Sequence, residues 1–274
     1  MNTFKKIASV FAAAAMALSL AACSNSNGSS SASDSTGDSS AASGSYRTVD
    51  QIKESGEITI GVFSDKNPFG YVDNDGKFQG YDVYFADRIA KDLGVELKLV
   101  PVEAASRVEF LETAKVDIIL ANFTVTDERK AVMDFSDSYA TGIQSIIVPN
   151  DSDIASPDDL AGKKIGTQRG TTGYIYCSDD FGDENVVAYD DGLTAVQALN
   201  NGQVDAVVID NAPAQEFVAA NPGLKVLDTS YAEEDYAIGM AKGSSLEDVV
   251  NAALEELKAD GTLQSIVDKY ITAE

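Results

Sequence analysis

Short apolar segments with the spacing of β-strands alternate along the chain with segments of helical spacing. Residues 57–62 and 95–102 alternate apolar and polar side chains as strands do. Residues 116–121 form a branched run that is apolar except for Asp117, with the length and composition of a buried strand. Residues 81–93 and 108–114 lie between them and have helical spacing. This order predicts a parallel sheet with crossover helices.

A second unit with the same strand–helix order follows residue 141. Its expected strands are 142–148, 163–167 and 204–209, and its expected helices are 194–201 and 212–220. A strand at 236–241 would carry the chain back to the first unit, which two helices, 246–259 and 263–270, would complete. Val116 and Asp117 recur 88 positions later as Val204 and Asp205, and by the same offset Asn122 corresponds to Asp210. The helix–turn–strand unit thus occurs twice, unless a common pattern has matched by chance.

The first 45 residues have no place in this pattern. Residues 1–22 predict a signal peptide, because a short apolar stretch follows two lysines. They end in Leu-Ala-Ala before Cys23, which resembles the lipobox of bacterial lipoproteins and implies a lipid on Cys23. An ordinary signal peptide is the alternative. Residues 24–45 contain 11 serines in 22 positions, so residues 23–45 are expected to be a lipidated cysteine followed by a flexible tether.

Charge and composition exclude several classes of function. The formal net charge is −24, which argues against nucleic acid and against docking on anionic lipid headgroups. The chain has no histidine and therefore lacks the commonest metal ligand and the usual general base. We expect no metal and no cofactor. With Cys23 lipidated, Cys177 has no disulfide partner, and we expect it to be buried rather than reactive.

Polar side chains gather where the strand 116–121 ends. Asn122 and Thr124 follow the strand, and Thr126 has the sequence context of a helix N-cap. Arg129 lies one turn into that helix, where its planar fork can bind a carboxylate through two parallel bonds. Such strand ends carry the ligand groups of open α/β sheets. A solvated surface arginine is the alternative.

These residues carry a family resemblance. The segment A-N-F-T-V-T-D-E-R, followed by D-F-S-D-S-Y, resembles the signature of amino-acid-binding proteins of bacterial ABC importers, and the likeness extends over nearly all of 56–271. It implies an α/β, two-lobed fold of the type II periplasmic-binding-protein kind, each lobe a mostly parallel sheet with flanking helices. The lobes would be 46–141 plus 237–274 and 142–236, joined by two hinge strands.

The resemblance also implies roles for individual residues. Arg129 would bind the ligand's α-carboxylate, Thr124 the carboxylate or the ammonium, and Asp210 the α-ammonium, although Asp210 also fits a helix cap. The loop Gly170-Thr171-Thr172-Gly173 would donate backbone N–H groups to the carboxylate, unless it is a plain strand-to-helix turn. The positions expected to contact the ligand are Arg129, Thr124, Asn122, Asp210, Thr172, Gly170, Gln168, Lys66, Phe69 and Arg107.

The loop 62–71 bears on the ligand's identity. Lys66 stands where many amino-acid binders carry an aromatic lid residue, so the side-chain contacts differ from theirs. The segments V-F-S-D-K-N-P-F-G-Y-V-D, V-E-A-A-S-R-V-E-F and A-N-F-T-V-T look most like the cysteine-binding branch, whereas 142–236 resembles general polar-amino-acid binders. We therefore expect a polar L-amino acid, with cysteine or cystine as the specific candidate. Glu103 and Arg107 either reach the cleft or are surface charges.

The resemblance implies a monomeric, non-enzymatic protein outside the cytoplasm, anchored to the cell membrane by the lipid on Cys23. It would pass its amino acid to an ABC permease and its ATPase. Two alternatives are an enzyme on the same scaffold, such as a cyclohexadienyl-type dehydratase, and the sensor domain of a receptor.

Overall fold

A computed structural model describes residues 46–270, with side chains to residue 266. The expected signal peptide, Cys23 and the tether lie outside these residues. Within 46–270 no helix is both long and apolar enough to cross a membrane.

The described chain alternates strands and helices in nearly the order that the sequence predicts. The strands are β1 Glu57–Val62, β2 Asp65–Lys66, β3 Gly70–Val72, β4 Phe78–Gln79, β5 Glu96–Pro101, β6 Ile118–Thr124, β7 Met133–Phe135, β8 Ala140–Pro149, β9 Ile165–Gln168, β10 Val186–Tyr189, β11 Ala206–Asp210, β12 Leu224–Val226 and β13 Ala232–Ala241. The helices are α1 Val49–Ser55, α2 Tyr81–Leu93, α3 Arg107–Glu112, α4 Asp127–Val132, α5 Thr172–Phe181, α6 Gly192–Asn200, α7 Asn211–Ala220, α8 Glu247–Ala259 and α9 Thr262–Tyr270. Short 3₁₀ turns cover Ala104–Ser106, Pro157–Leu160 and Asp183–Asn185.

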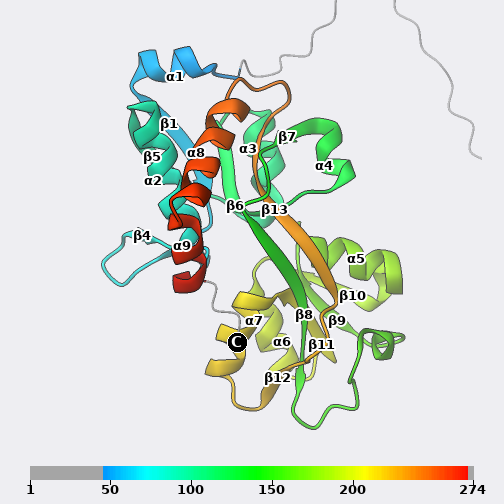
Figure 1. The fold of residues 1–274 in the computed structure, drawn as a ribbon. Helices are drawn as coiled ribbons and strands as arrows, with labels where there is room; N and C mark the ends of the chain where they lie inside the picture. Colours follow the sequence, from blue (N-terminus) through cyan, green and yellow to red (C-terminus); the bar gives the residue numbers. More distant parts are fainter. Residues whose placement is uncertain (1–45, 271–274) are drawn as a thin grey trace, which may run out of the picture. The chain divides into compact units, whose positions relative to one another are not determined.

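One mixed sheet runs through the described residues in the order β10-β9-β11-β8-β13-β6-β1-β5 (Figure 1). Toward one end β1 lies parallel to β5 and β6, and toward the other β9 lies parallel to β10 and β11. The long strands β8 and β13 pair antiparallel between these two groups. The predicted α/β class is confirmed. The predicted lobe boundaries fall inside β8 and β13, and the division into lobes stays a prediction.

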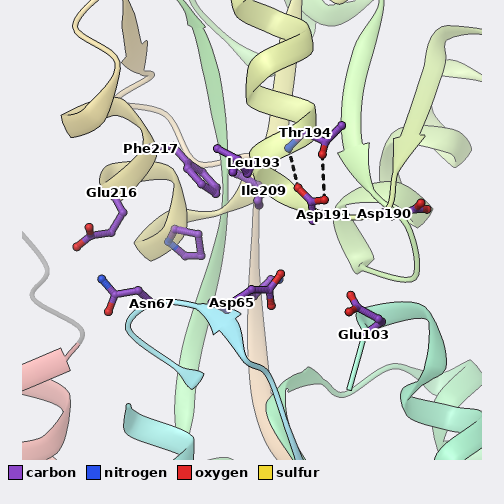
Figure 2. Close-up of a pocket in the computed structure, with 13 residues that line it drawn as sticks. Asp65, Asn67, Glu103, Asp190, Asp191, Leu193, Thr194, Ile209, Glu216 and Phe217 are labelled. Atoms are coloured by element: carbon purple, nitrogen blue, oxygen red, sulfur yellow. Dashed lines mark hydrogen bonds between the residues drawn. The ribbon is translucent and has the colours of Figure 1, made fainter. Parts of the chain in front are cut away.

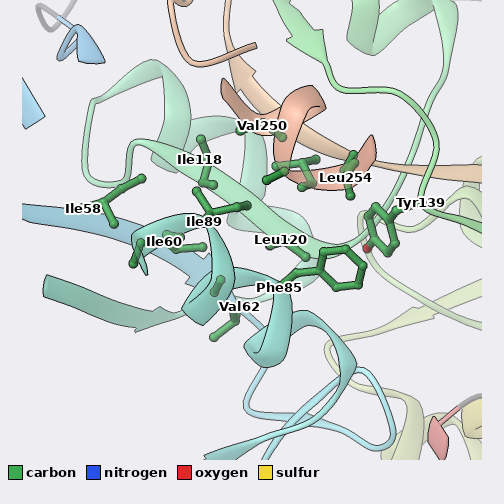
Figure 3. Close-up of a cluster of buried hydrophobic side chains, with 14 of the residues drawn as sticks. Ile58, Ile60, Val62, Phe85, Ile89, Ile118, Leu120, Tyr139, Val250 and Leu254 are labelled. Atoms are coloured by element: carbon green, nitrogen blue, oxygen red, sulfur yellow. The ribbon is translucent and has the colours of Figure 1, made fainter. Parts of the chain in front are cut away.

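The side-chain alternation of β6 explains how the sheet is covered. All seven of its residues are buried. Ile118 and Leu120 join a core of β1, α2 and α8 (Figure 3), whereas Ile119 and Phe123 face a second core on the opposite side. The expected strand at 57–62 is confirmed as β1, and all of its residues except Glu57 are buried. A Cβ added at Gly61 would lie 2.6 Å from Ile119 Cδ1.

The internal repeat is confirmed by matching hydrogen bonds ahead of β6 and β11. The Asp117 N–H donates to Thr59 O (2.8 Å), and Asp117 Oδ2 accepts from the Thr59 N–H (2.7 Å). The Asp205 N–H donates to Lys164 O, and Asp205 Oδ2 accepts from the Lys164 N–H, both at 2.7 Å. The same reciprocal pair therefore precedes both strands.

The loop 62–71 is more ordered than the sequence predicts. It contributes β2 and the start of β3 to a three-stranded antiparallel sheet, β2-β3-β4. Strand β2 carries Lys66, which is buried although lysine is rarely a core residue.

Candidate functional site

The Asp210 carboxylate lies at the end of β11 and is only 5% exposed. Its Oδ2 accepts from Lys66 Nζ (3.2 Å) and Asn122 Nδ2 (2.9 Å), and its Oδ1 accepts from Gln144 Nε2 and the Tyr236 hydroxyl. Helix α7 begins at the next residue, but the Asp210 side chain caps none of its N–H groups. The position suits a helix cap, yet the carboxylate instead gathers four donors from distant segments.

Asn122 and Asp210 are the corresponding positions of the internal repeat, and they meet in a direct hydrogen bond. The Asn122 backbone has a φ of 30°, and its N–H donates to Asp82 Oδ2 (3.2 Å). Asp82 is completely buried on α2 and also accepts from the Tyr139 hydroxyl (2.9 Å). Burial raises the pKa of Asp82 to about 7. Asp82 thus positions the backbone of Asn122, a predicted ligand residue, through this hydrogen bond.

Arg129 is buried and held by backbone carbonyls. Helix α4 begins as predicted, with Thr126 Oγ1 accepting from the Arg129 N–H (3.2 Å). The guanidinium donates to Thr124 O (2.7 Å) and Gly170 O (3.2 Å) and lies 4.5 Å from the centroid of the Phe123 ring. Burial lowers the pKa of Arg129, an effect opposed by the nearby carboxylates. The solvated alternative for this arginine is wrong.

Arg107 is buried more deeply still, so it is not a surface charge. Its guanidinium donates to Ala104 O (3.0 Å), Ala121 O (2.9 Å) and Gly170 O (3.0 Å). Two arginines therefore converge on the Gly170 carbonyl. Gly170 has a φ of 75°, and a Cβ there would lie 2.5 Å from Ala105 Cα. Only glycine satisfies both conditions without strain.

The predicted threonines face each other beside a carboxylate that the sequence motifs do not reveal. Thr124 Oγ1 lies 3.4 Å from Thr172 Oγ1 and 3.0 Å from Glu234 Oε2. Gln144 Nε2 donates to the same Glu234 oxygen (3.2 Å). Glu234 lies on β13, and burial raises its pKa. Gln144 could have been noticed as a polar residue in the largely apolar strand β8, whereas Glu234 stands between two other acidic residues, Glu233 and Asp235, and carries no such sequence signal.

Two further predicted residues lie at the edge of this polar cluster. Gln168 is buried and donates from Nε2 to Asp190 O (3.2 Å). Phe69 packs edge-on against Tyr236, with 5.9 Å between ring centroids. Phe69 therefore packs against Tyr236, whose hydroxyl donates to Asp210.

A pocket of about 500 Å³ opens beside Lys66 (Figure 2). Its apolar part comes from Ile209, Pro213, Leu193 and Phe217. Its carboxylates come from separate elements: Asp65 on β2, Glu103 ahead of α3, Asp190 and Asp191 ahead of α6, and Glu216 on α7. Burial raises the pKa values of Asp65 and Glu103, and the neighbouring carboxylates add to the effect. Thr194 binds Asp191 through its N–H (2.7 Å) and hydroxyl (2.9 Å), so that carboxylate caps α6.

Cys177 is completely buried on α5, as expected, and burial raises the pKa of its thiol to about 12. Across the described part of the chain, no group of three or more cysteine or acidic side chains is arranged to hold a metal ion.

Comparison with known proteins identifies the family. The family model for bacterial extracellular solute-binding proteins, family 3, matches residues 58–273. The L-cystine-binding protein TcyJ of Escherichia coli is 33% identical over 230 residues, covering 82% of this chain and 86% of that protein. The structure of a cysteine-binding protein from Campylobacter jejuni is similar, with a TM-score of 0.77, 36% identity, and coverage of 82% of this chain and 92% of the other. Holo ArgBP from T. maritima has a TM-score of 0.72 and 39% identity, covering 79% of this chain and 98% of the other. The chain therefore belongs to the bacterial extracellular solute-binding proteins, family 3.

Proposed function

We propose that this protein captures a polar L-amino acid outside the cytoplasm and delivers it to an ABC importer. One observation carries the proposal: a buried polar cluster combines a carboxylate, Asp210, with a guanidinium, Arg129. A chain of hydrogen bonds connects them. Gln144 donates to both Asp210 and Glu234. Glu234 in turn accepts from the Thr124 hydroxyl, and the Thr124 carbonyl accepts from Arg129. Opposite charges held in one site match the two ends of a zwitterion.

The carboxylate end is formed by Arg129, Thr124 and the start of α5 at Thr172. Backbone N–H groups at a helix N-terminus attract an anion, and an arginine fork fits a carboxylate. The ammonium end is formed by Asp210, supported by Asn122. We infer these roles from the predicted motif positions and from their proximity in the cluster.

The ligand's side chain would extend toward the pocket beside Lys66, past Gln168 and Asp190. Acidic groups around an apolar wall favour a polar side chain that carries hydrogen-bond donors or positive charge. The cystine- and cysteine-binding relatives support cysteine or cystine, as the sequence suggests. Arginine is the second candidate, because the pocket carries carboxylates and ArgBP is also similar.

Closure of two lobes around the ligand fits the hydrogen bonds that link the predicted lobes. Both Arg107 and Arg129, on one side of the predicted boundary, donate to the Gly170 carbonyl on the other. Exclusion of water strengthens such charged contacts. In this proposal the closed form is the one that the permease and its ATPase recognise.

The remaining parts of the proposal extend beyond the described residues. A lipid on Cys23 would hold the monomeric protein at the membrane through the tether. The chain would bind its amino acid without converting it, as its relatives' names indicate for them. Steady turnover of an amino or keto acid by purified protein would favour the dehydratase alternative.

A thermal-shift screen against the twenty L-amino acids and L-cystine tests the proposal. At 100 times its dissociation constant, a ligand adds about 2.7 kcal/mol to the free energy of unfolding. We expect one chemical group of amino acids to stabilise the protein. Arg129→Ala and Arg129→Lys should both abolish the shift, because lysine keeps the charge but loses the fork.

The matched control is Arg88→Ala, since Arg88 pairs with Asp92 and Glu256 on the surface. This variant should retain the full ligand-induced shift. A well-folded wild-type protein that responds to none of these compounds would contradict the proposal.

A further inference from the structure

Glu234 places a carboxylate among the groups assigned above to the ligand's carboxylate. Its Oε2 accepts from the Thr124 hydroxyl at 3.0 Å, and that hydroxyl lies 3.4 Å from the Thr172 hydroxyl, which is close enough to influence the Glu234 carboxylate. Arg129 lies close enough for its charge to interact with Glu234. Three of the groups assigned to the ligand's carboxylate therefore already face a carboxylate that belongs to the chain.

Lys66 has the corresponding position at the other end of the site. Its ammonium lies 3.2 Å from Asp210 Oδ2, and its side chain is only 6% exposed. Asp210 keeps three other donors, Asn122, Gln144 and Tyr236, so its carboxylate would stay hydrogen-bonded without Lys66. The ammonium is thus positioned where an α-ammonium would bind.

We propose that Glu234 and Lys66 form a built-in competitor for the amino acid, with Glu234 engaging the carboxylate end of the site and Lys66 the ammonium end. A bound amino acid displaces both side chains. This inference rests on the proposed function, because it takes the two ends of the site from there. As a consequence, the protein would retain only an amino acid that binds tightly enough to displace both the Glu234 and the Lys66 side chains.

The burial of Glu234 makes its competition sensitive to protonation. Glu234 is 6% exposed, and its Oε1 makes no hydrogen bond to any described residue. Burial raises the pKa of Glu234, with the Asp210 charge adding to the effect and the polar groups of Thr172, Thr124 and Gln144 opposing it. The other ionisable groups that interact with Glu234 are Arg129, Tyr176 and Tyr236. A ligand carboxylate bound to the same donors would disfavour the ionised form of Glu234 further. The affinity for the amino acid should therefore increase as pH falls.

The test is isothermal titration calorimetry of the purified protein with L-cystine, L-cysteine, L-arginine and L-glutamine. Glu234→Gln keeps the size of the side chain and removes its charge. We expect it to bind the same amino acid on the order of tenfold more tightly than wild type at pH 7.5, because a like charge has been removed. Glu233→Gln is the matched control, since Glu233 is exposed on the same strand, and its affinity should equal that of wild type.

Lys66→Met tests the other end and should also bind more tightly, whereas Lys77→Met, at an exposed position of the β3–β4 turn, should not differ from wild type. The pH dependence supplies an independent readout. Between pH 8 and pH 5 wild-type affinity should rise more than that of Glu234→Gln. Asp82 titrates in both proteins, so the difference between them reports Glu234.

Each result decides between the hypotheses. Weaker binding by Glu234→Gln or Lys66→Met would make that side chain a ligand contact and overturn the inference while leaving the proposed function intact. Equal affinity and equal pH dependence would also overturn it. Failure of wild type and of both variants to bind any of the four amino acids would overturn the inference and the proposed function together.

Discussion

Replacement of the buried carboxyl of Asp82 by an amide should make the stability of this protein less dependent on pH. Burial raises the pKa of Asp82 from 3.8 to about 7. Each unit of this shift corresponds to 1.36 kcal/mol, so the full effect on the free energy of unfolding is roughly 4 kcal/mol. Asparagine resembles the protonated acid: its oxygen can accept from the Asn122 N–H, and its amide can donate to the Tyr139 hydroxyl.

The sign follows from the direction of the shift. The folded state retains the Asp82 proton up to about pH 7, whereas the unfolded state releases it near pH 4. The stabilisation from this proton is therefore fully present below about pH 4 and is lost as pH rises through about 7. Asp82→Asn has no such loss, so its stability relative to wild type should increase between pH 4 and 7 and then level off.

Urea unfolding at five pH values between 4.5 and 8.5, on wild type and Asp82→Asn, measures this difference. Asp87→Asn is the control, because Asp87 lies on the same helix but is half exposed and pairs with Lys91 at the surface. Its stability relative to wild type should change little over this range. A constant difference between Asp82→Asn and wild type from pH 5 to pH 8 would show that Asp82 is not held protonated, and would refute the reasoning.

Two further predictions concern packing. Gly170→Ala should lower the free energy of unfolding by more than the roughly 1–2 kcal/mol of a left-handed alanine, because its Cβ would also meet Ala105. Gly202→Ala is the control in chemical denaturation: it has a φ of 66° but open space around the added Cβ, so equal losses would contradict the close approach. In a Cys23→Ser background, Cys177 should resist a thiol reagent at pH 8 until the protein unfolds, and rapid labelling of the folded protein would contradict its burial.

The sequence by itself determined most of the order of strands and helices, the repeated unit and several residues of the proposed ligand site. These features depend on local rules: the period of apolar residues, helix caps, and a motif in which Asn122, Thr124 and Arg129 are close along the chain. Such rules act over a few residues, so the printed sequence contains them. They also indicated that the ends of strands 116–121 and 204–209 carry functional groups.

Only the tertiary structure decided which groups face these residues. Lys66 and Asp210 are 144 positions apart, and Thr124 and Glu234 are 110 positions apart. No local pattern encodes either contact. A polar residue in a strand, such as Glu234, has the same local preferences whether it faces water or a buried arginine. Its role depends on the charges that other segments bring beside it, because burial and neighbouring charges together set the energy of an ionised group.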